Sequence, residues 1–388
     1  MDRKTNNILV IKLCCLGDII QMTPALRGLR REYPQAEITL LISRWVEDLV
    51  KCIPFVDNYI LYDAPYSTSI PRKVRETLAL VRKLRKNSFD LIIIGHRNWL
   101  FGALALLSGT HTRVGFDGVP FLTHRAAFDP EVHEVERYLE LVRSLDISVE
   151  EPKTELKPVS EDRESVDTLL ERFGVARNAG LIGIFPGGGE NPGTSMTIKR
   201  WYPDQYTRLV EILCREYNYA VALVGSKSDA ELNEGIRGAV SESRRVFNLA
   251  GQLTLGQFIA LAERCSLFVG GDSGPTHIAA AVGTPTLSLF GPSDPRLVAP
   301  RGRLHRYVWK QVHCSPCYTP LTVMNRKNFN GKDFVCWTGT HACMKNLVID
   351  DVLQVIREML GENARIGNSS EERMPKETQL KVIGDPNT

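Results

Sequence analysis

Three short loops in the sequence combine glycine with charged or hydroxyl residues, which is what a phosphate or sugar site requires. The first is Leu16-Gly17-Asp18, which follows an apolar run. Gly17 lets the backbone turn tightly and approach a ligand. Asp18 stands where an apolar-periodic segment begins, so it is either a general base or a helix cap. The loop alone does not decide between these two roles.

The second loop runs over residues 270–277 and reads Gly-Gly-Asp-Ser-Gly-Pro-Thr-His. Gly274 and Pro275 are typical of a helix start, and Gly283 is typical of a helix end. The unpaired amides of such a helix start suit a diphosphate. Asp272 would repel a diphosphate, so we expect it to accept hydrogen bonds from sugar hydroxyls or backbone amides. The alternative is a well-capped structural helix.

The third loop is Phe185-Pro186-Gly187-Gly188-Gly189, and the basic pair Lys199-Arg200 follows it. Three glycines cannot pack a core, but they can form a backbone cradle for phosphate. Lys199 could then offset the charge of a leaving diphosphate. The alternative is a flexible hairpin with a solvated basic pair. None of the three loops has the spacing of a P-loop or of G-x-G-x-x-G.

Apolar runs alternate with helix-periodic segments along the chain, which predicts parallel, doubly wound sheets. In the first half we expect strands at NNILVIKL, EITLLIS, 58–62 and FDLIII, with helices over 19–33 and 74–86. In the second half we expect strands at LIGIF, AVALVG, RRVFNLA, LFVGG and TLSLFG, with helices that include 203–217 and 255–264. The loops with chemistry then follow strands at the carboxyl edge, where open α/β sheets bind ligands.

A polar, proline-marked stretch over 150–158 separates the two halves and reads as a linker. We therefore expect a Rossmann-like domain over 1–155 and a second one over 156–360. Residues 361–388 lose apolar periodicity and predict a polar, disordered tail.

Composition and charge restrict the class of protein. Of 388 residues, 43% are hydrophobic and 24% are charged, which is ordinary for a folded globular protein. The net charge of +3 gives no reason to expect nucleic acid as a partner. The first apolar stretch is interrupted by Lys12 and Asp18 and is too short for a membrane span or a secretory signal. We expect a cytoplasmic protein.

Two segments resemble a known family. Residues 16–18 with 23–26 are similar to the N-terminal signature of glycosyltransferase family 9, and residues 272–277 with 289–295 resemble its C-terminal signature. The resemblance covers about residues 7–360 and includes the ADP-heptose:lipopolysaccharide heptosyltransferases. It implies the GT-B architecture, two Rossmann-like domains with an interdomain cleft, and metal-independent, inverting transfer without a catalytic cofactor.

The resemblance also implies roles for individual residues. Asp18 becomes the general base that activates the acceptor hydroxyl, and Lys199 becomes the partner of the donor phosphate. Cys14 and Cys15 depart from the pattern because related enzymes commonly have small hydroxyl residues there. The expected donor-binding residues are Gly17, Gly187, Gly188, Asp229 (for the ribose), Asp272, Ser273, Gly274 and His277.

The acceptor is expected on the N-terminal domain, beside a basic helix. Residues 72–86 contain seven basic residues and one Glu, with Val74, Leu78, Val81 and Leu84 spaced to seat the helix on the sheet. The basic face is either only solvated or attracts an anionic lipid surface or a phosphorylated sugar acid. The acceptor candidates are His96, Arg97, Arg113 and Arg137, with His133 nearby.

Four cysteines near the end form a separate group: Cys314, Cys317, Cys336 and Cys343. Their spacing could bind a structural zinc ion, although six residues separate the second pair, more than is usual. The alternative is that they are reduced or disulfide-linked. In either case we expect a structural role for them.

We therefore expect an inverting glycosyltransferase that moves a heptose or related sugar from an ADP-sugar to an inner-core lipopolysaccharide acceptor. Its partners would be the nucleotide-sugar donor, the anionic glycolipid and the inner face of the cytoplasmic membrane, as a peripheral protein. Two alternatives are a GT-B-like nucleotide-sugar epimerase and a non-catalytic nucleotide-sugar binding protein.

Overall fold

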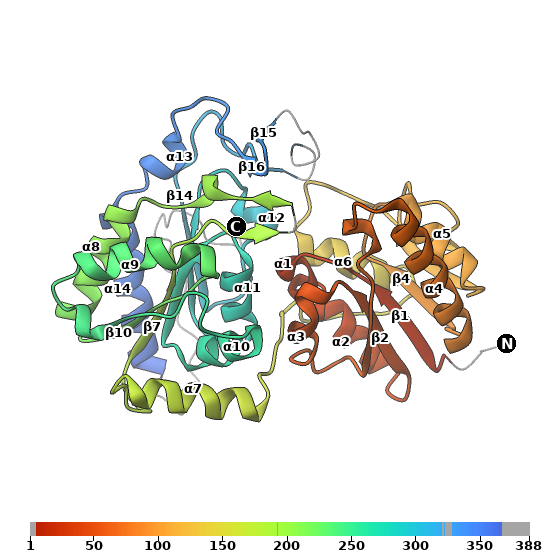
Figure 1. Ribbon diagram of the computed structural model, residues 1–388, viewed down its shortest axis with the longest axis horizontal. Coiled ribbons are helices and arrows are strands. Elements are labelled where there is room, and N and C mark those ends of the chain that lie inside the picture. The colour runs from red at the N-terminus through yellow and green to blue at the C-terminus, as the bar shows by residue number, and fades with distance from the viewer. Residues whose placement is uncertain (1–4, 192, 320–321, 323–327, 367–388) are drawn as a thin grey trace. The chain divides into compact units, whose positions relative to one another are not determined.

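The chain divides into two compact units, Met1–Lys157 and Pro158–Thr388. The computed structural model describes residues 5–191, 193–319, 322 and 328–366 (Figure 1). The boundary between the units falls at the end of the polar stretch that reads as a linker in the sequence.

Unit 1 is built on a six-stranded sheet with the order β3-β2-β1-β4-β5-β6, and all of its strand pairs are parallel. The strands are β1 (Asn7–Ile11), β2 (Glu37–Ile42), β3 (Asn58–Leu61), β4 (Leu91–Ile94), β5 (Thr112–Phe116) and β6 (His124–Ala126). The helices are α1 (Leu16–Gln21), α2 (Thr23–Glu32), α3 (Glu47–Val50), α4 (Ile70–Asn87), α5 (Trp99–Leu107) and α6 (Glu134–Arg143), with 3-10 turns Arg44–Val46 and Ala64–Tyr66.

Alternate side chains of the strands point to opposite faces, and each face of the sheet is covered by helices. Leu9 and Ile11 of β1 pack against Leu84 of α4 and Phe101 of α5 in one core. Figure 1 shows α4 and α5 side by side over this face, with α2 and α6 in contact with each other on the opposite one.

Two expectations about unit 1 need correction. The helix expected over 19–33 is two helices, because the chain breaks at Met22 and α2 then begins with Pro24 in its first turn. In α4 the sheet buries Leu80 and Leu84, whereas Val74 and Leu78 are 53% and 52% exposed. The helical period was correct, but the buried stripe has a different phase around the helix.

Unit 2 repeats the architecture with a six-stranded parallel sheet of order β11-β10-β7-β12-β13-β14. The strands are β7 (Leu181–Phe185), β10 (Ala220–Leu223), β11 (Val246–Asn248), β12 (Leu267–Gly271), β13 (Thr286–Phe290) and β14 (His305–Trp309). The helices are α7 (Ser160–Arg172), α8 (Pro203–Arg215), α9 (Ala230–Ala239), α10 (Leu255–Arg264), α11 (Gly274–Ala281), α12 (Pro295–Val298), α13 (Ala342–Lys345) and α14 (Ile349–Ile366). The described residues of unit 2 also include the 3-10 turns η3 (Thr197–Lys199), η4 (Lys227–Asp229) and η5 (Ser243–Arg245).

A small four-stranded sheet joins the segment after the triple glycine to the cysteine-containing segment. Its strands are β8 (Glu190–Asn191), β9 (Thr194–Ser195), β15 (Phe329–Asn330) and β16 (Asp333–Phe334), in the order β15-β16-β9-β8. Met196, Ile198 and Phe334 form its buried core. Because η3 follows β9 directly, this sheet holds the backbone that leads to Lys199.

Both large sheets have, in chain order, the strand arrangement 3-2-1-4-5-6 of dinucleotide-binding folds. In such sheets the strand order reverses between the first and fourth strands, and ligands bind at the carboxyl ends there. The reversal lies between β1 and β4 in unit 1 and between β7 and β12 in unit 2. We therefore look for ligand sites at the carboxyl ends of these four strands.

The end of the chain differs from the expectation. Helix α14 continues to Ile366, so the first residues of the expected tail over 361–388 are helical, and residues 367–388 lie outside the described part. Ile356 and Met359 of this helix are buried in the unit 2 core. Within the described residues, no helix is both long enough and apolar enough to cross a membrane.

The core of unit 2 gives a stability prediction. Leu209 of α8 is completely buried in the main cluster, so we expect Leu209→Ala to lower the free energy of unfolding by about 2–5 kcal/mol. Arg208→Ala, on the exposed side of the same helix, should change it by less than about 0.5 kcal/mol. Chemical denaturation followed by circular dichroism measures both. Equal effects of the two substitutions would contradict the packing of α8.

Candidate active site

A buried ion pair lies at the strand-order reversal of unit 2. Lys199 Nζ donates a hydrogen bond of 2.6 Å to Asp272 Oδ2 and another of 3.2 Å to the Asp272 carbonyl oxygen. The two side chains are only 10% and 11% exposed. The ammonium group also lies 4.2 Å from the centre of the Tyr318 ring. The pair fixes the Lys199 ammonium group beside the end of β12.

The charges around Asp272 keep it ionised. Burial alone would raise the pKa of Asp272, but Lys199 and His277 outweigh burial and hold this pKa well below its usual range. His277 Nε2 is 3.9 Å from Asp272 Oδ1. The sequence led us to expect sugar hydroxyls or amides as the partners of Asp272. In the structure its carboxylate is paired with Lys199.

Helix α11 begins as the sequence predicts. It starts at Gly274 with Pro275 in the first turn, and Gly283 follows its end with a φ of +91°. Ser273 precedes the helix without a side-chain cap, and Thr276 Oγ1 instead donates to the carbonyl oxygen of Gly271 (2.8 Å). The first backbone amides of α11 therefore have no cap from Ser273, which leaves them suited to an anion beside Lys199.

The glycines after β7 make close contacts with the protein itself. A Cβ at Gly188 would lie 2.1 Å from the carbonyl oxygen of Met196, and one at Gly187 would lie 2.7 Å from Asp229 Oδ1. Gly189 has a φ of +85°. These glycines are required by the close approach of the 185–199 segment to its neighbours, so a phosphate cradle is not needed to explain them.

Asp229 also has a complete set of internal partners. Its Oδ2 accepts hydrogen bonds from the backbone N–H and the hydroxyl of Ser226, in a capping box at η4. Its Oδ1 accepts a bond of 3.1 Å from Arg200. These contacts are sufficient to account for the buried carboxylate.

The strand-order reversal of unit 1 carries a second lysine–aspartate pair. Lys12 Nζ donates a hydrogen bond of 2.7 Å to Asp18 Oδ2, and the two side chains are 7% and 38% exposed. Burial alone would lower the pKa of Lys12, but Asp18 raises it, so this lysine stays charged. Asp18 lies in the first turn of α1, and Cys15 is the residue at the helix cap position. Asp18 is thus an accessible carboxylate held by a buried cation.

Cys14 lies in the β1–α1 loop, just before α1, whose first turn includes Gly17. A hydrogen bond with the Cys15 thiol, helped by Lys12 and the Tyr66 hydroxyl, lowers the pKa of Cys14 to about 6 despite burial. The same contact and burial raise the pKa of Cys15 well above its usual range. Cys14 is therefore a thiolate at neutral pH, four residues from Asp18.

Two of the four acceptor candidates have structural roles. His96 Nε2 accepts a hydrogen bond of 2.8 Å from the Leu13 backbone N–H, and its ring stacks on Phe101. Burial, and then Lys12, hold the pKa of His96 well below its usual range, so it is neutral. Arg113 donates to backbone carbonyls of Phe121, Thr110 and His111. His96 positions the β1–α1 loop, and Arg113 stabilises the backbone on either side of β5.

The other two candidates, Arg97 and Arg137, both make cation–π contacts with the ring of Phe128. The Arg97 guanidinium lies 3.7 Å from the ring centre and that of Arg137 lies 5.3 Å from it. Arg137 is fully buried and pairs with Glu134, but its Nε has no hydrogen-bond partner among the described residues. His133 caps α6, which carries Glu134 and Arg137. Arg97 is exposed and remains available to a ligand.

Sequence reasoning missed three residues that surround the proposed catalytic groups. Lys12 was treated only as an interruption of an apolar run, yet a charged residue directly after a buried strand was a usable signal. Glu134 lies close enough to Asp18 that burial and then Asp18 raise its pKa. Tyr318, which faces Lys199, is more than a hundred residues away in the sequence and gave no signal.

The four C-terminal cysteines do not form a metal site in the structure. In the described part of the chain, no three His, Cys, Asp or Glu side chains are grouped so that they could hold a metal ion. All four cysteines are free thiols in the structure, which corresponds to the reduced form of the alternative. Cys317 and Cys336 pack on the core of the small sheet, and His341 Nε2 bonds with the Ile198 carbonyl oxygen (2.7 Å). This segment supports the backbone next to Lys199.

Comparisons with known proteins agree with this fold. The chain is 28% identical to lipooligosaccharide heptosyltransferase 2 of Haemophilus influenzae, over 76% of this chain and 86% of that protein. It is 28% identical to lipopolysaccharide heptosyltransferase 2 of Escherichia coli, over 78% of this chain and 87% of that protein.

Solved structures show the same architecture. The E. coli ADP-heptose lps heptosyltransferase II aligns with a TM-score of 0.72 at 24% identity, covering 92% of this chain and 99% of that one. The family 9 glycosyl transferase of Veillonella parvula aligns with a TM-score of 0.77 at 21% identity, covering 93% and 99%. The expected α/β class with two Rossmann-like units, the GT-B class, is confirmed.

The family itself follows from the sequence match. Residues 77–327, which are more than half of the chain, match the model of glycosyltransferase family 9 (heptosyltransferase). This match includes Lys199 and the whole 270–277 loop, and the relatives align over most of their own length. The chain belongs to glycosyltransferase family 9 and is a glycosyltransferase.

Proposed function

We propose that this protein transfers a heptose from ADP-heptose to an inner-core lipopolysaccharide acceptor, with inversion at the anomeric carbon. The observation that carries the proposal is a lysine–aspartate pair at the strand-order reversal of each sheet, in a family of heptosyltransferases. The names of the related proteins support heptose, ADP and lipopolysaccharide as the substrates.

In the proposed reaction, Asp18 accepts the proton of the acceptor hydroxyl as the hydroxyl oxygen bonds to the anomeric carbon. The bond from that carbon to the diphosphate oxygen breaks, and ADP leaves with the electron pair. Lys12 holds the Asp18 carboxylate in place and loses its ionised partner when Asp18 is protonated. Lys199 and the first amides of α11 stabilise the leaving diphosphate, so the chemistry requires no metal.

The acceptor is proposed to bind unit 1 and the donor to bind unit 2. Arg97 supports the first assignment because it is an exposed cation next to the end of β4. The proposal includes a cytoplasmic location, peripheral at the inner face of the membrane, because the acceptor is a glycolipid and α4 is strongly basic.

The alternatives make different predictions for nucleotide release. An epimerase is not favoured, because the family is one of glycosyltransferases. A non-catalytic binding protein would release no ADP from ADP-heptose. We expect ADP release only when a heptose-deficient lipopolysaccharide acceptor is present, with a product heavier by one heptose in mass spectrometry. ADP release without acceptor, or no transfer with it, would contradict the proposed function.

The general-base role of Asp18 can be tested directly. Asp18→Asn keeps the shape of the side chain but cannot take up the proton, so we expect turnover to fall by about 100- to 10,000-fold. Donor affinity should stay within a few-fold. Asp48→Asn, at an exposed carboxylate of α3, serves as the control and should leave turnover unchanged. Near-normal turnover of Asp18→Asn would show that Asp18 is not the base.

Lys199 is expected to act mainly on the leaving group. Lys199→Ala should cost roughly 2–4 kcal/mol in the transition state, more than it weakens donor binding. Lys199→Arg should restore activity only in part, because the planar guanidinium differs in shape from an ammonium group. Steady-state kinetics with saturating acceptor and calorimetric donor affinity separate the two effects. A loss of donor affinity with unchanged turnover would make Lys199 a ground-state binding residue.

The Cys14 thiolate provides a reporter of ligand binding near Asp18. Because the pKa of Cys14 is lowered to about 6, its alkylation rate should rise through about pH 6 and level off near neutral pH. Ligand bound at the β1–α1 loop should slow this alkylation. Peptide mass spectrometry measures the rate, with Cys214 as the control, since burial raises its pKa to about 11.

Two results would count against this assignment. A half-maximal alkylation rate above about pH 8 would contradict the lowered pKa of Cys14. An alkylation rate that neither donor nor acceptor changes would contradict a ligand site at this loop.

A further inference from the structure

The large apolar side chains that unit 1 exposes are confined to one side of its sheet. Among the described residues of this unit, all of them belong to α4, α5, the 3-10 turn before α4 and the β5–β6 segment, within residues 66–121. They are Tyr66, Ile70, Val74, Leu78, Trp99, Leu106, Leu107 and Phe121. Helices α1, α2, α3 and α6 on the opposite face contribute none.

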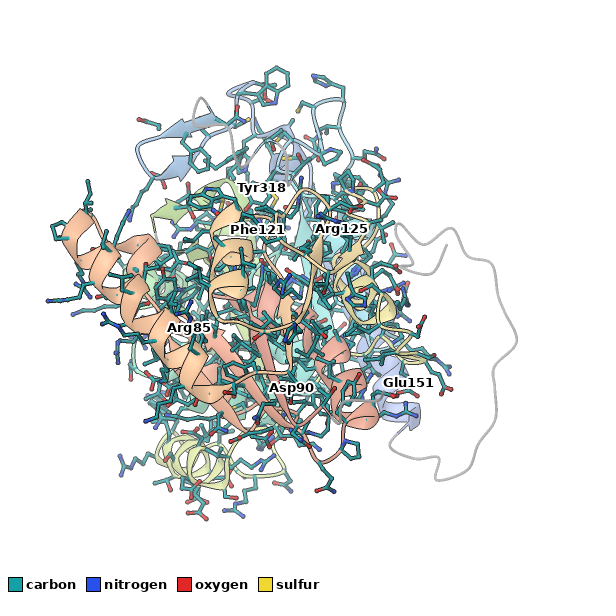
Figure 2. All side chains as sticks on the ribbon, turned by 90° about the vertical axis from the view of Figure 1, so that its right-hand side faces the viewer. Arg85, Asp90, Phe121, Arg125, Glu151 and Tyr318 are labelled. Atoms are coloured by element: carbon teal, nitrogen blue, oxygen red, sulfur yellow. The ribbon has the colours of Figure 1, made fainter. Side chains whose placement is uncertain are left out.

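Helices α4 and α5 form one continuous surface, here called the α4–α5 face. Leu84 of α4 and Leu104 of α5 are buried in the same core beneath it. At one end Arg85 Nε donates a hydrogen bond of 2.7 Å to the Leu107 carbonyl oxygen, which ties the helices together. Figure 2 looks onto this side, with Arg85 on α4 and Phe121 beside the far end of α5.

The exposed apolar residues of α4 form a stripe of their own. Ile70, Val74 and Leu78 follow one another at intervals of four residues, so they line one side of the helix. The stripe is separate from the buried pair Leu80 and Leu84. The core therefore does not explain these residues, and a contiguous exposed apolar surface marks an interaction site.

The charge of the face indicates what it binds. Helix α4 carries seven basic side chains and a single acidic one, Glu76, which pairs with Arg72. Helix α5 has the sequence WLFGALALL and carries no charge. An apolar helix beside a strongly basic one suits a surface with anionic groups above hydrocarbon, as at a lipid bilayer. A second copy of this face is disfavoured, because a symmetric contact would bring the two basic helices together.

We propose that the α4–α5 face docks on an anionic lipid bilayer, with Trp99, Leu106 and Leu107 inserted at the boundary of headgroups and acyl chains. The stripe of Ile70, Val74 and Leu78 lies at the same boundary, and the basic residues of α4 bind lipid phosphates. The inference rests on the proposed function, since docking would hold the enzyme at the surface that contains a glycolipid acceptor.

The chain offers a matched pair of tryptophans for the test. Trp99 on α5 and Trp337 in unit 2 are both 66% exposed. The probe is vesicles of equal parts phosphatidylglycerol and phosphatidylcholine with brominated acyl chains, which quench inserted tryptophan. We expect quenching that persists in Trp337→Phe and is largely lost in Trp99→Phe. Quenching that persists in Trp99→Phe, or is lost in Trp337→Phe, would overturn the proposal.

Sedimentation with the same vesicles separates the apolar and electrostatic contributions. The triple variant Trp99→Ser, Leu106→Ser, Leu107→Ser should bind them at least about tenfold more weakly. Leu304→Ser with Val348→Ser, at exposed apolar residues of unit 2, is the control and should bind normally. Arg75→Gln with Arg82→Gln should bind more weakly to anionic vesicles but equally to vesicles of phosphatidylcholine alone. Unchanged binding of both face variants would overturn the proposal.

These vesicles contain no acceptor, so the result is independent of catalysis. If the wild-type chain transfers heptose to a detergent-dispersed acceptor but does not bind vesicles, docking and the peripheral location are wrong, and the proposed heptose transfer stands. If it binds vesicles through Trp99 but transfers nothing, the proposed function is wrong and docking stands. If the wild-type chain forms a dimer in ultracentrifugation that the triple variant abolishes, and vesicles quench nothing, the face binds a second copy instead.

Discussion

The buried ion pair of Lys199 and Asp272 is the interaction on which the candidate site of unit 2 depends. Two charges that are about nine-tenths buried are tolerated only because each neutralises the other, and removing one partner of such a pair typically costs about 3–5 kcal/mol. The pair joins the end of β12 to the end of η3. It therefore fixes the distance between the amino end of α11 and the segment after the triple glycine.

Much of the C-terminal region can be understood as support for this pair. The backbone before Lys199 is held by the small sheet, by the core of Met196, Ile198 and Phe334, and by the hydrogen bond from His341. Tyr318 places the face of its ring against the ammonium group. The cysteine-containing segment thus contributes to the site through packing and backbone contacts.

The lysine–aspartate pair of unit 1 differs in one respect that matters for chemistry. Lys12 is as buried as Lys199, but Asp18 is more than three times as exposed as Asp272. A buried cation with an accessible carboxylate suits proton transfer at Asp18, because solvent and substrate can reach the base. A pair in which both side chains are buried suits a fixed electrostatic and positioning role, because neither side chain is readily accessible to solvent. The same two residue types therefore favour different roles in the two units.

The sequence predicted features that depend on local backbone chemistry. The start of α11 at Gly274 and Pro275, the turn at Gly283 and the alternation of strands and helices follow from local conformational preferences and hydrophobic period. It did not show the partners that a side chain or a glycine has within the protein. Asp229 and the glycines after β7 are explained by contacts with Ser226, Arg200 and Met196, and a composition suited to phosphate could not show that these groups already had neighbours.

Helix α4 is a second case in which the sequence could not identify which residues are buried. Its apolar residues recur at helical spacing, and that spacing defines stripes around a helix without saying which stripe faces the sheet. Leu80 and Leu84 face it, so Val74 and Leu78 face outward next to a basic surface. Burying both stripes would require a second layer of protein over α4. Helix α4 therefore has two apolar stripes with different partners. One stripe packs on the sheet, and the other faces the proposed lipid bilayer.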